Sequence, residues 1–225
     1  MVLKQLSRKV HIDIYRHLAF AMVGGFFAGY AVLCRAGVLA NAQTMNLVEL
    51  VINTLMGNGQ HVLIHLGSLA TYVVGTMLTV FIPHFLHWNM RRVSPIITAF
   101  MAILLSFLPE DMALLVSLYP IFFAMSIQWS TFTGADGFMS STIFSTNNTK
   151  QSSLALAEYL CHGDRAHLRK LRLYLFTILC FHLGVTISYF GVKWIGIPSS
   201  LLALPLLAWC YVLVVCEDQA ETVTA

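Results

Sequence analysis

One arrangement of residues occurs twice in this chain, 102 positions apart, and both copies are polar stretches within a strongly apolar sequence. The first copy contains Ala28, Tyr30 and Thr44-Met45-Asn46, and the second contains Ser130, Phe132 and Thr146-Asn147-Asn148. A further match, His65-Leu66-Gly67 against His182-Leu183-Gly184, has a spacing of 117, so the second half has gained about fifteen residues. A duplicated membrane domain whose helices break at matching polar points is typical of a transporter-like fold.

The composition places the chain in a membrane. Of its 225 residues, 58% are hydrophobic and 10% are charged, whereas charged residues make up about a quarter of ordinary soluble domains. We therefore predict one polytopic all-α helix bundle over residues 1–225, without a separate soluble domain. The formal charge of +3 comes mostly from one membrane face, so we interpret it as a topology signal and expect no nucleic-acid partner.

Six apolar runs predict six membrane spans, at residues 14–34, 61–85, 93–108, 112–130, 171–190 and 201–216. The third and sixth runs are short. Pro120 and Pro205 lie inside runs and are expected to kink their helices.

Basic residues set the orientation. With six spans and a cytoplasmic N-terminus, eleven Lys and Arg residues lie on the cytoplasmic side and two, Arg35 and Lys193, lie outside, so both termini are predicted to be cytoplasmic.

Three spans per half, at 14–108 and 112–216, are an odd number, so the two halves run in opposite directions and form an inverted repeat. If the stretches after the Thr-x-Asn motifs also crossed, eight spans would form a parallel repeat. Residues 46–56 are too short to span about 30 Å at about 1.5 Å per residue, which favours six.

Each polar break predicts the start of a short helix that does not cross the membrane. Thr44 or Asn46 is expected to be the N-cap of the first, with Thr146 or Asn148 in the second. Two helix N-termini that approach from opposite sides would form a site for an anion or a carbonyl oxygen. The alternative is that each is a capped helix at the membrane interface.

Polar side chains around the two breaks are the predicted substrate-binding residues. They are Asn41, Gln43, Thr44, Asn46, Glu49, Asn53, Gln128, Ser130, Thr146, Asn148 and Gln151. Glu49 is the leading candidate for substrate contact or coupling, because a carboxylate inside a membrane is costly and should face the bundle interior or water. The alternative is a hydrated Glu49 on a helix at the interface.

Residue patterns for metal sites and enzymes are absent from the sequence. His61 and His65 lie one helical turn apart but have no carboxylate or Cys beside them at helical spacing, and the five Cys residues include no C-x-x-C pair. His65 and His182, each close to a glycine, are expected to serve helix packing. Nucleophile, phosphate-loop and zinc-protease motifs are missing. We therefore expect no metal, no cofactor and no catalytic residues.

The residues of the first break also carry a family resemblance. Three stretches carry it: Gly24-Gly25-Phe26-Phe27-x-x-Tyr30, Arg35-x-Gly37-Val38-x-Ala40-Asn41-Ala42-Gln43-Thr44-x-Asn46, and Gln128-x-x-x-Phe132 with Thr146-x-Asn148. They resemble the YoaK-like family of bacterial inner-membrane proteins. The resemblance covers essentially the whole chain and implies a multi-span α-helical protein of the bacterial cytoplasmic membrane, with no settled activity. Ala28 stands where the family is typically acidic, and Met45 and Asn147 where glycine is usual.

Two functions follow from these patterns. The first is a membrane transporter or channel for a small solute or ion, with its site at the paired polar breaks. The alternative is a binding or assembly protein that recognises lipid or a partner helix without transport. In either case membrane lipid is a partner, and a homodimer is expected because six spans amount to half of the usual transporter bundle.

Overall fold

Helices account for nearly all of the computed structural model, which describes residues 2–34, 38–113 and 115–222. The first half contains α1 (Val2–Cys34), α2 (Thr44–Leu55), α3 (Gly59–Phe81, continued by a π-helical turn at Ile82–Leu86) and α4 (Met90–Ser106). The second half contains α5 (Tyr119–Thr131), strands β1 (Gly134–Ala135) and β2 (Phe138–Met139), α6 (Thr146–His162), α7 (Arg165–Ile195) and α8 (Ala203–Thr222). Short 3₁₀ turns at Val116–Leu118 and Ile197–Leu202 precede α5 and α8. The predicted all-α class is confirmed.

Four helical segments are long and apolar enough to cross a membrane. They are His11–Cys34, Gly59–Leu86, Arg165–Ile195 and Ile197–Ala220. The remaining two apolar runs form α4, with 17 residues, and α5, with 13. The prediction that the sixth run is short is wrong, because the 3₁₀ turn before α8 extends that segment. The fourth run is short instead, since Val116–Leu118 form a 3₁₀ turn and α5 begins only at Tyr119.

Neither proline expected to kink a span lies in a helix interior. Pro120 is in the first turn of α5, and Pro205 is the third residue of α8. The first turn of a helix has no partner for its N–H groups, so a proline there costs no hydrogen bond. Each proline therefore lies at the start of a helix, and the expected kinks inside the spans are not formed.

Helices of one half pack against helices of the other. The long helix α1 packs against α7 and α8, and α5 packs correspondingly against α3 and α4. Gly184 of α7 makes the first crossing tight, because a Cβ there would lie 2.8 Å from Phe26 N and even closer to Met22 O. From the other side, a Cβ on Gly25 would lie 2.6 Å from the carbonyl carbon of Phe181. Glycine is required at this crossing because the two backbones touch.

The crossing of α3 and α5 uses glycine in the same way. A Cβ on Gly67 would overlap the Tyr119 ring, at 2.9 Å from Cζ, and one on Gly75 would lie 2.9 Å from Phe123 O. Gly67, Gly75 and Gly184 are thus all used for contacts within the chain.

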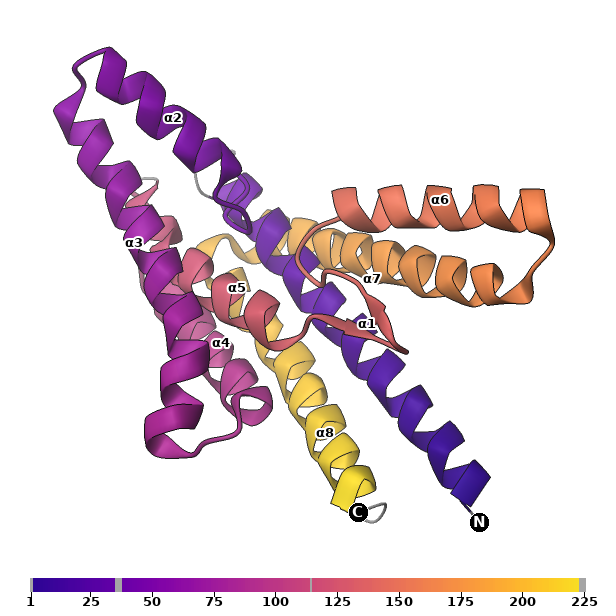
Figure 1. Cartoon of the computed structure of the whole chain (residues 1–225). Coiled ribbons are helices and arrows are strands. Elements are labelled where there is room, and N and C mark those ends of the chain that lie inside the picture. The colour runs from indigo at the N-terminus through magenta and orange to yellow at the C-terminus, as the bar shows by residue number, and fades with distance from the viewer. Residues whose placement is uncertain (1, 35–37, 114, 223–225) are drawn as a thin grey trace.

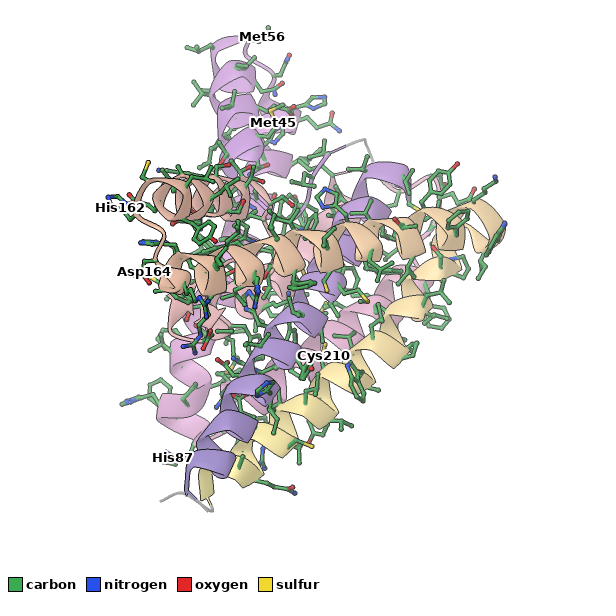
Figure 2. All side chains as sticks on the ribbon, turned by 90° about the vertical axis from the view of Figure 1, so that its right-hand side faces the viewer. Met45, Met56, His87, His162, Asp164 and Cys210 are labelled. Atoms are coloured by element: carbon green, nitrogen blue, oxygen red, sulfur yellow. The ribbon has the colours of Figure 1, made fainter. Side chains whose placement is uncertain are left out.

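Two helical hairpins extend from the centre of the molecule in different directions, α2–α3 to the upper left and α6–α7 to the right (Figure 1). The second is longer, since α6 has 17 residues against 12 in α2, and α7 has 31 against 23 in α3. The residues gained by the second half therefore lengthen this hairpin. Figure 2 shows Met45 and Met56 at the two ends of α2, which rises out of the bundle.

Buried aromatic residues of α1 and α5 form the centre of the core, with the Phe20 and Phe132 rings stacked at 3.8 Å. Large apolar side chains also face outward along the helices. They include Leu63 and Val80 of α3, Phe100 of α4, Leu179 and Trp194 of α7, and Trp209 of α8. An apolar exterior around an apolar core is what a bundle in lipid requires.

Candidate functional site

The two polar breaks meet at the centre of the fold. As predicted, α2 begins at Thr44 and α6 begins at Thr146. The Asn41 side chain, just before α2, donates from Nδ2 to the Ile143 carbonyl at 3.1 Å and to the Gly24 carbonyl at 3.0 Å. Asn41 and Ile143 are 102 positions apart, the spacing of the repeat. Equivalent segments of the two halves are therefore in direct contact.

Gln128 makes a parallel connection from α5. Its Nε2 donates to the Phe20 carbonyl at 3.0 Å and to Thr142 Oγ1 at 3.1 Å. Gly24 allows the approach, since a Cβ there would lie 3.1 Å from Ile143 Cα and closer still to the Thr142 carbonyl. Two amides thus hold the 142–143 segment against α1. We call the group Asn41, Gln128, Thr142 and Ile143 the central junction.

The central junction contains two buried oxygens with unused hydrogen-bonding capacity. Asn41 and Gln128 are fully buried, and within the described part of the chain neither Asn41 Oδ1 nor Gln128 Oε1 has a hydrogen-bond partner. A buried amide oxygen without a donor is costly and is usually satisfied in native proteins. These oxygens can accept a hydrogen bond from a ligand or coordinate a cation.

Asn148 fixes the start of α6. Its Oδ1 accepts from Ser140 Oγ at 3.0 Å and from the Ser141 N–H at 3.2 Å, and its Nδ2 donates to the carbonyls of Ser141 at 2.7 Å and Phe144 at 3.0 Å. His17 Nε2 lies 2.9 Å from Ser140 Oγ, which links this cluster to α1.

Asn46, the equivalent residue of α2, is also buried but bonds to α3. Its Nδ2 donates to Gln43 Oε1 at 2.7 Å and to the His65 carbonyl at 3.1 Å, while its Oδ1 lies 2.8 Å from His65 Nδ1. The predicted N-caps are wrong: Gln43 and Ser145 occupy the cap positions, without side-chain cap hydrogen bonds. Thr44 and Thr146 are exposed. The two asparagines point inward, so their amides tie each helix start to neighbouring segments.

Other predicted site residues bond away from the junction. Glu49, with 41% of its side chain exposed, pairs with His65 Nε2 at 3.3 Å. Asn53 Nδ2 donates to the Glu49 carbonyl at 2.8 Å, and Ser130 Oγ donates to the Ser126 carbonyl at 2.8 Å, both inside their own helices. Gln151 is half-buried on α6. The contacts of Glu49 and Ser130 thus differ from the expectation that both line the junction.

A second polar feature, the ionic pocket, was not predicted. It is a cavity of about 540 Å³ lined by Asp13, Arg16, Arg91, Thr131, Thr133, Gly134, Asp136, Gly137, Arg169 and Glu217. Arg16 Nε lies 2.9 Å from Glu217 Oε2, and these side chains are only 6% and 4% exposed. Arg16 also pairs with Asp13, and Arg91 with Glu217. These ion pairs join the N-terminal half of α1 to the start of α4 and to the C-terminal end of α8.

The β1–β2 turn closes the pocket on its other side. Asp136 and Gly137 have φ values of 55° and 77°, as a two-residue Asp-Gly hairpin turn requires. The Asp136 N–H donates to Asp13 Oδ2 at 2.7 Å, and its carboxylate pairs with Arg169 of α7. The Asp-Gly dipeptide is a hairpin signal that sequence reasoning overlooked. The charged residues were considered only as indicators of membrane orientation.

The chain was compared with known proteins. A model of the family described as "Protein of unknown function (DUF1275)" matches residues 17–215. The chain belongs to this family. Neither the curated proteins nor the solved structures include a match to it. The DUF1275 match spans the whole central junction, whereas Asp13, Arg16 and Glu217 of the ionic pocket lie just outside it.

Among the residues that the structure describes, no group of three or more His, Cys, Asp and Glu side chains could hold a metal ion.

Asn148→Ala is expected to destabilise the protein by about 2–4 kcal/mol, because it removes the four hydrogen bonds that the buried amide makes to Ser140, Ser141 and Phe144. Asn147→Ala is the matched control, since Asn147 is the same residue type, adjacent and exposed. Thermal unfolding of both variants in detergent measures the difference. Equal midpoints would contradict the role of the Asn148 amide.

Proposed function

We propose that this DUF1275 protein is a small-solute transporter or channel of the bacterial inner membrane, with cytoplasmic termini and a site at the central junction. One observation carries the proposal: the segments before α2 and α6 touch through Asn41 and Ile143, and two buried amide oxygens beside them have no partner. Irregular backbone at membrane depth is tolerated only where it is buried in protein or lines a cavity. A binding site between paired breaks is the arrangement used by transporters.

The reciprocal packing supports an inverted repeat of six spans. Under this proposal α1, α3 and α4 cross in the first half and α5, α7 and α8 in the second, while α2 and α6 do not cross. This assignment rests on the polar breaks at which α2 and α6 begin and not on length, since α2 has 12 residues and the crossing helix α5 has 13. The contacts of α1 with α7 and of α5 with α3 are those expected if the halves are related by a twofold axis. The resemblance to YoaK-like proteins favours the same location.

The chemistry of the junction suggests what the solute offers. Asn41 Oδ1 and Gln128 Oε1 are acceptors, so the bound solute supplies N–H or O–H donors, or is a cation. Close packing around Gly24 leaves little room for a large group. We therefore expect a small polar solute.

Uptake by proteoliposomes tests the proposal. Purified protein is reconstituted and assayed with radiolabelled amino acids, sugars and monovalent cations. Gln128→Met keeps the length of the side chain but removes both the acceptor oxygen and the Nε2 group that bonds to Phe20 and Thr142, and in folded protein it is expected to lower uptake at least about tenfold. Gln60→Met, at an exposed position of α3, is the control and should transport normally. Absence of flux for every solute would overturn the proposal.

One observation favours the alternative, a non-transporting protein that recognises lipid or a partner helix. The outer side of α2 is apolar and exposed, with Val48 and Val51 at 50% and 58% exposure and Leu55 at 83%. Such a surface needs lipid, a partner helix or a second copy of the chain. Under this alternative, substitutions at the central junction would leave partner binding unchanged, and charged residues on α2 would abolish it.

A further inference from the structure

The ionic pocket has the size and chemistry of a ligand site. Its volume of about 540 Å³ lies within the range of about 300–1,000 Å³ that is usual for small-molecule pockets. Three guanidinium groups, from Arg16, Arg91 and Arg169, line it together with three carboxylates, from Asp13, Asp136 and Glu217. The lining therefore has both charge signs and a formal balance of zero.

The most buried pair in the pocket has unused hydrogen-bonding capacity. Arg16 Nε and Glu217 Oε2 lie 2.9 Å apart as an ion pair without hydrogen-bond geometry, and within the described residues neither atom has a hydrogen bond to another group. Both side chains are more than nine-tenths buried, and both line the cavity. Buried charged groups gain most from well-directed hydrogen bonds, because the alternative of bonding to water is absent.

The balance of charges decides which ligand fits. An anion alone would pair with Arg16 but would add a negative charge beside Glu217, and a cation alone would do the reverse. A molecule that carries both charges can place its ammonium against the carboxylates of the pocket and its carboxylate against the guanidinium groups, without changing the net charge. We infer that the ionic pocket binds a small zwitterion with a primary ammonium and a carboxylate, the chemical class of the α-amino acids.

This inference rests on the proposed function in one respect, because it names the class of solute that the transporter takes. Polar groups lead from the pocket towards the junction. His17, next to Arg16, lies 2.9 Å from Ser140 Oγ, which donates to Asn148 Oδ1 at 3.0 Å at the start of α6. The pocket is thus linked to the start of α6, next to the 142–143 segment of the central junction.

Calorimetric titration of the full-length protein in detergent tests the inference. The probes are the common α-amino acids, with acetate and ethylammonium as matched ligands that carry one charge each. At least one amino acid is expected to bind at least about tenfold more tightly than either single-charge ligand, a difference of roughly 1.4 kcal/mol. Failure of every amino acid to bind, or equal binding of acetate or ethylammonium, would overturn the inference.

A blocking variant locates the site. Thr133 is exposed at the pocket, so Thr133→Trp should fill the cavity without disturbing the core and should weaken amino-acid binding at least about tenfold. Thr149→Trp, on an exposed face of α6, should bind like the unmodified protein. Unchanged binding by a folded Thr133→Trp variant would place the ligand elsewhere and refute the assignment.

The two proposals fail separately. Flux of a solute without amino-acid binding at the pocket would refute the zwitterion site and leave transport standing. Amino-acid binding that Thr133→Trp abolishes, without flux of any solute, would establish the site and refute the transporter.

Discussion

Gly184→Ala is expected to prevent stable folding. A Cβ at this position would lie 2.8 Å from Phe26 N and closer to Met22 O, and both obstacles are backbone atoms of α1 that cannot rotate away. Overpacking by a methyl group typically costs about 1–3 kcal/mol when side chains can adjust, so the cost here should be at least about 3 kcal/mol. That is a large part of a total stability of about 5–15 kcal/mol. The yield of monodisperse protein and the unfolding midpoint measure the loss.

Gly59→Ala is the control for this substitution. Gly59 is the first residue of α3, and a Cβ there would meet nothing within 4 Å. Alanine is a better helix former than glycine by about 1 kcal/mol in helix interiors, so this variant should be as stable as the unmodified protein or slightly more so. If both variants unfold at the same temperature, α1 and α7 do not cross in contact at Gly184.

Glu217→Gln is expected to destabilise the protein by about 3–5 kcal/mol. The substitution removes the carboxylate that pairs with both Arg16 and Arg91, and the Arg16 side chain is only 6% exposed. The loss leaves the buried Arg16 with Asp13 as its remaining carboxylate partner, and removing one member of a buried ion pair is far more costly than loss of a surface pair. The midpoint of thermal unfolding in detergent measures the effect.

Glu158→Gln provides the comparison. Glu158 pairs with His162 at 3.0 Å on α6, but the two side chains are 52% and 65% exposed. Solvent screens such a pair, so its loss should hardly change the midpoint. A comparable effect of both substitutions would show that the Arg16–Glu217 pair is hydrated and that the pocket is open to water at its base.

Local patterns predicted the positions of the helices well. The six apolar runs coincide with α1, α3, α4, α5, α7 and α8, and the repeated Thr-x-Asn motifs coincide with the starts of α2 and α6. Helix starts follow from turn-forming residues, which act over a few positions. The length of a helix depends on more than its apolar run. For that reason the 3₁₀ turn before α8, and the turns that shorten α5, were not foreseen.

Contacts between distant segments were predicted less well. The repeat indicated that the two breaks would meet, but not that Asn41 and Gln128 would hold the 142–143 segment against α1. An asparagine near a helix start can cap the helix or bond to a neighbouring segment equally well. Asn46 was predicted as an N-cap, but its side chain bonds to His65. The ionic pocket depends on α1, α4, α7, α8 and the β1–β2 turn coming together at one place. Periodicity indicates which face of a helix is apolar, but it does not identify the partner of a charged residue near its end.

The reciprocal packing of the halves constrains the order in which the protein acquires its structure during synthesis. Helix α1 leaves the ribosome before its principal partner, α7, which is completed only at Ile195. Until then Gly25, with no side chain to cover it, faces no neighbouring backbone, and Arg16 still lacks Glu217. The N-terminal half therefore has no complete core of its own, and its packing is completed only after α7 and α8 have been made.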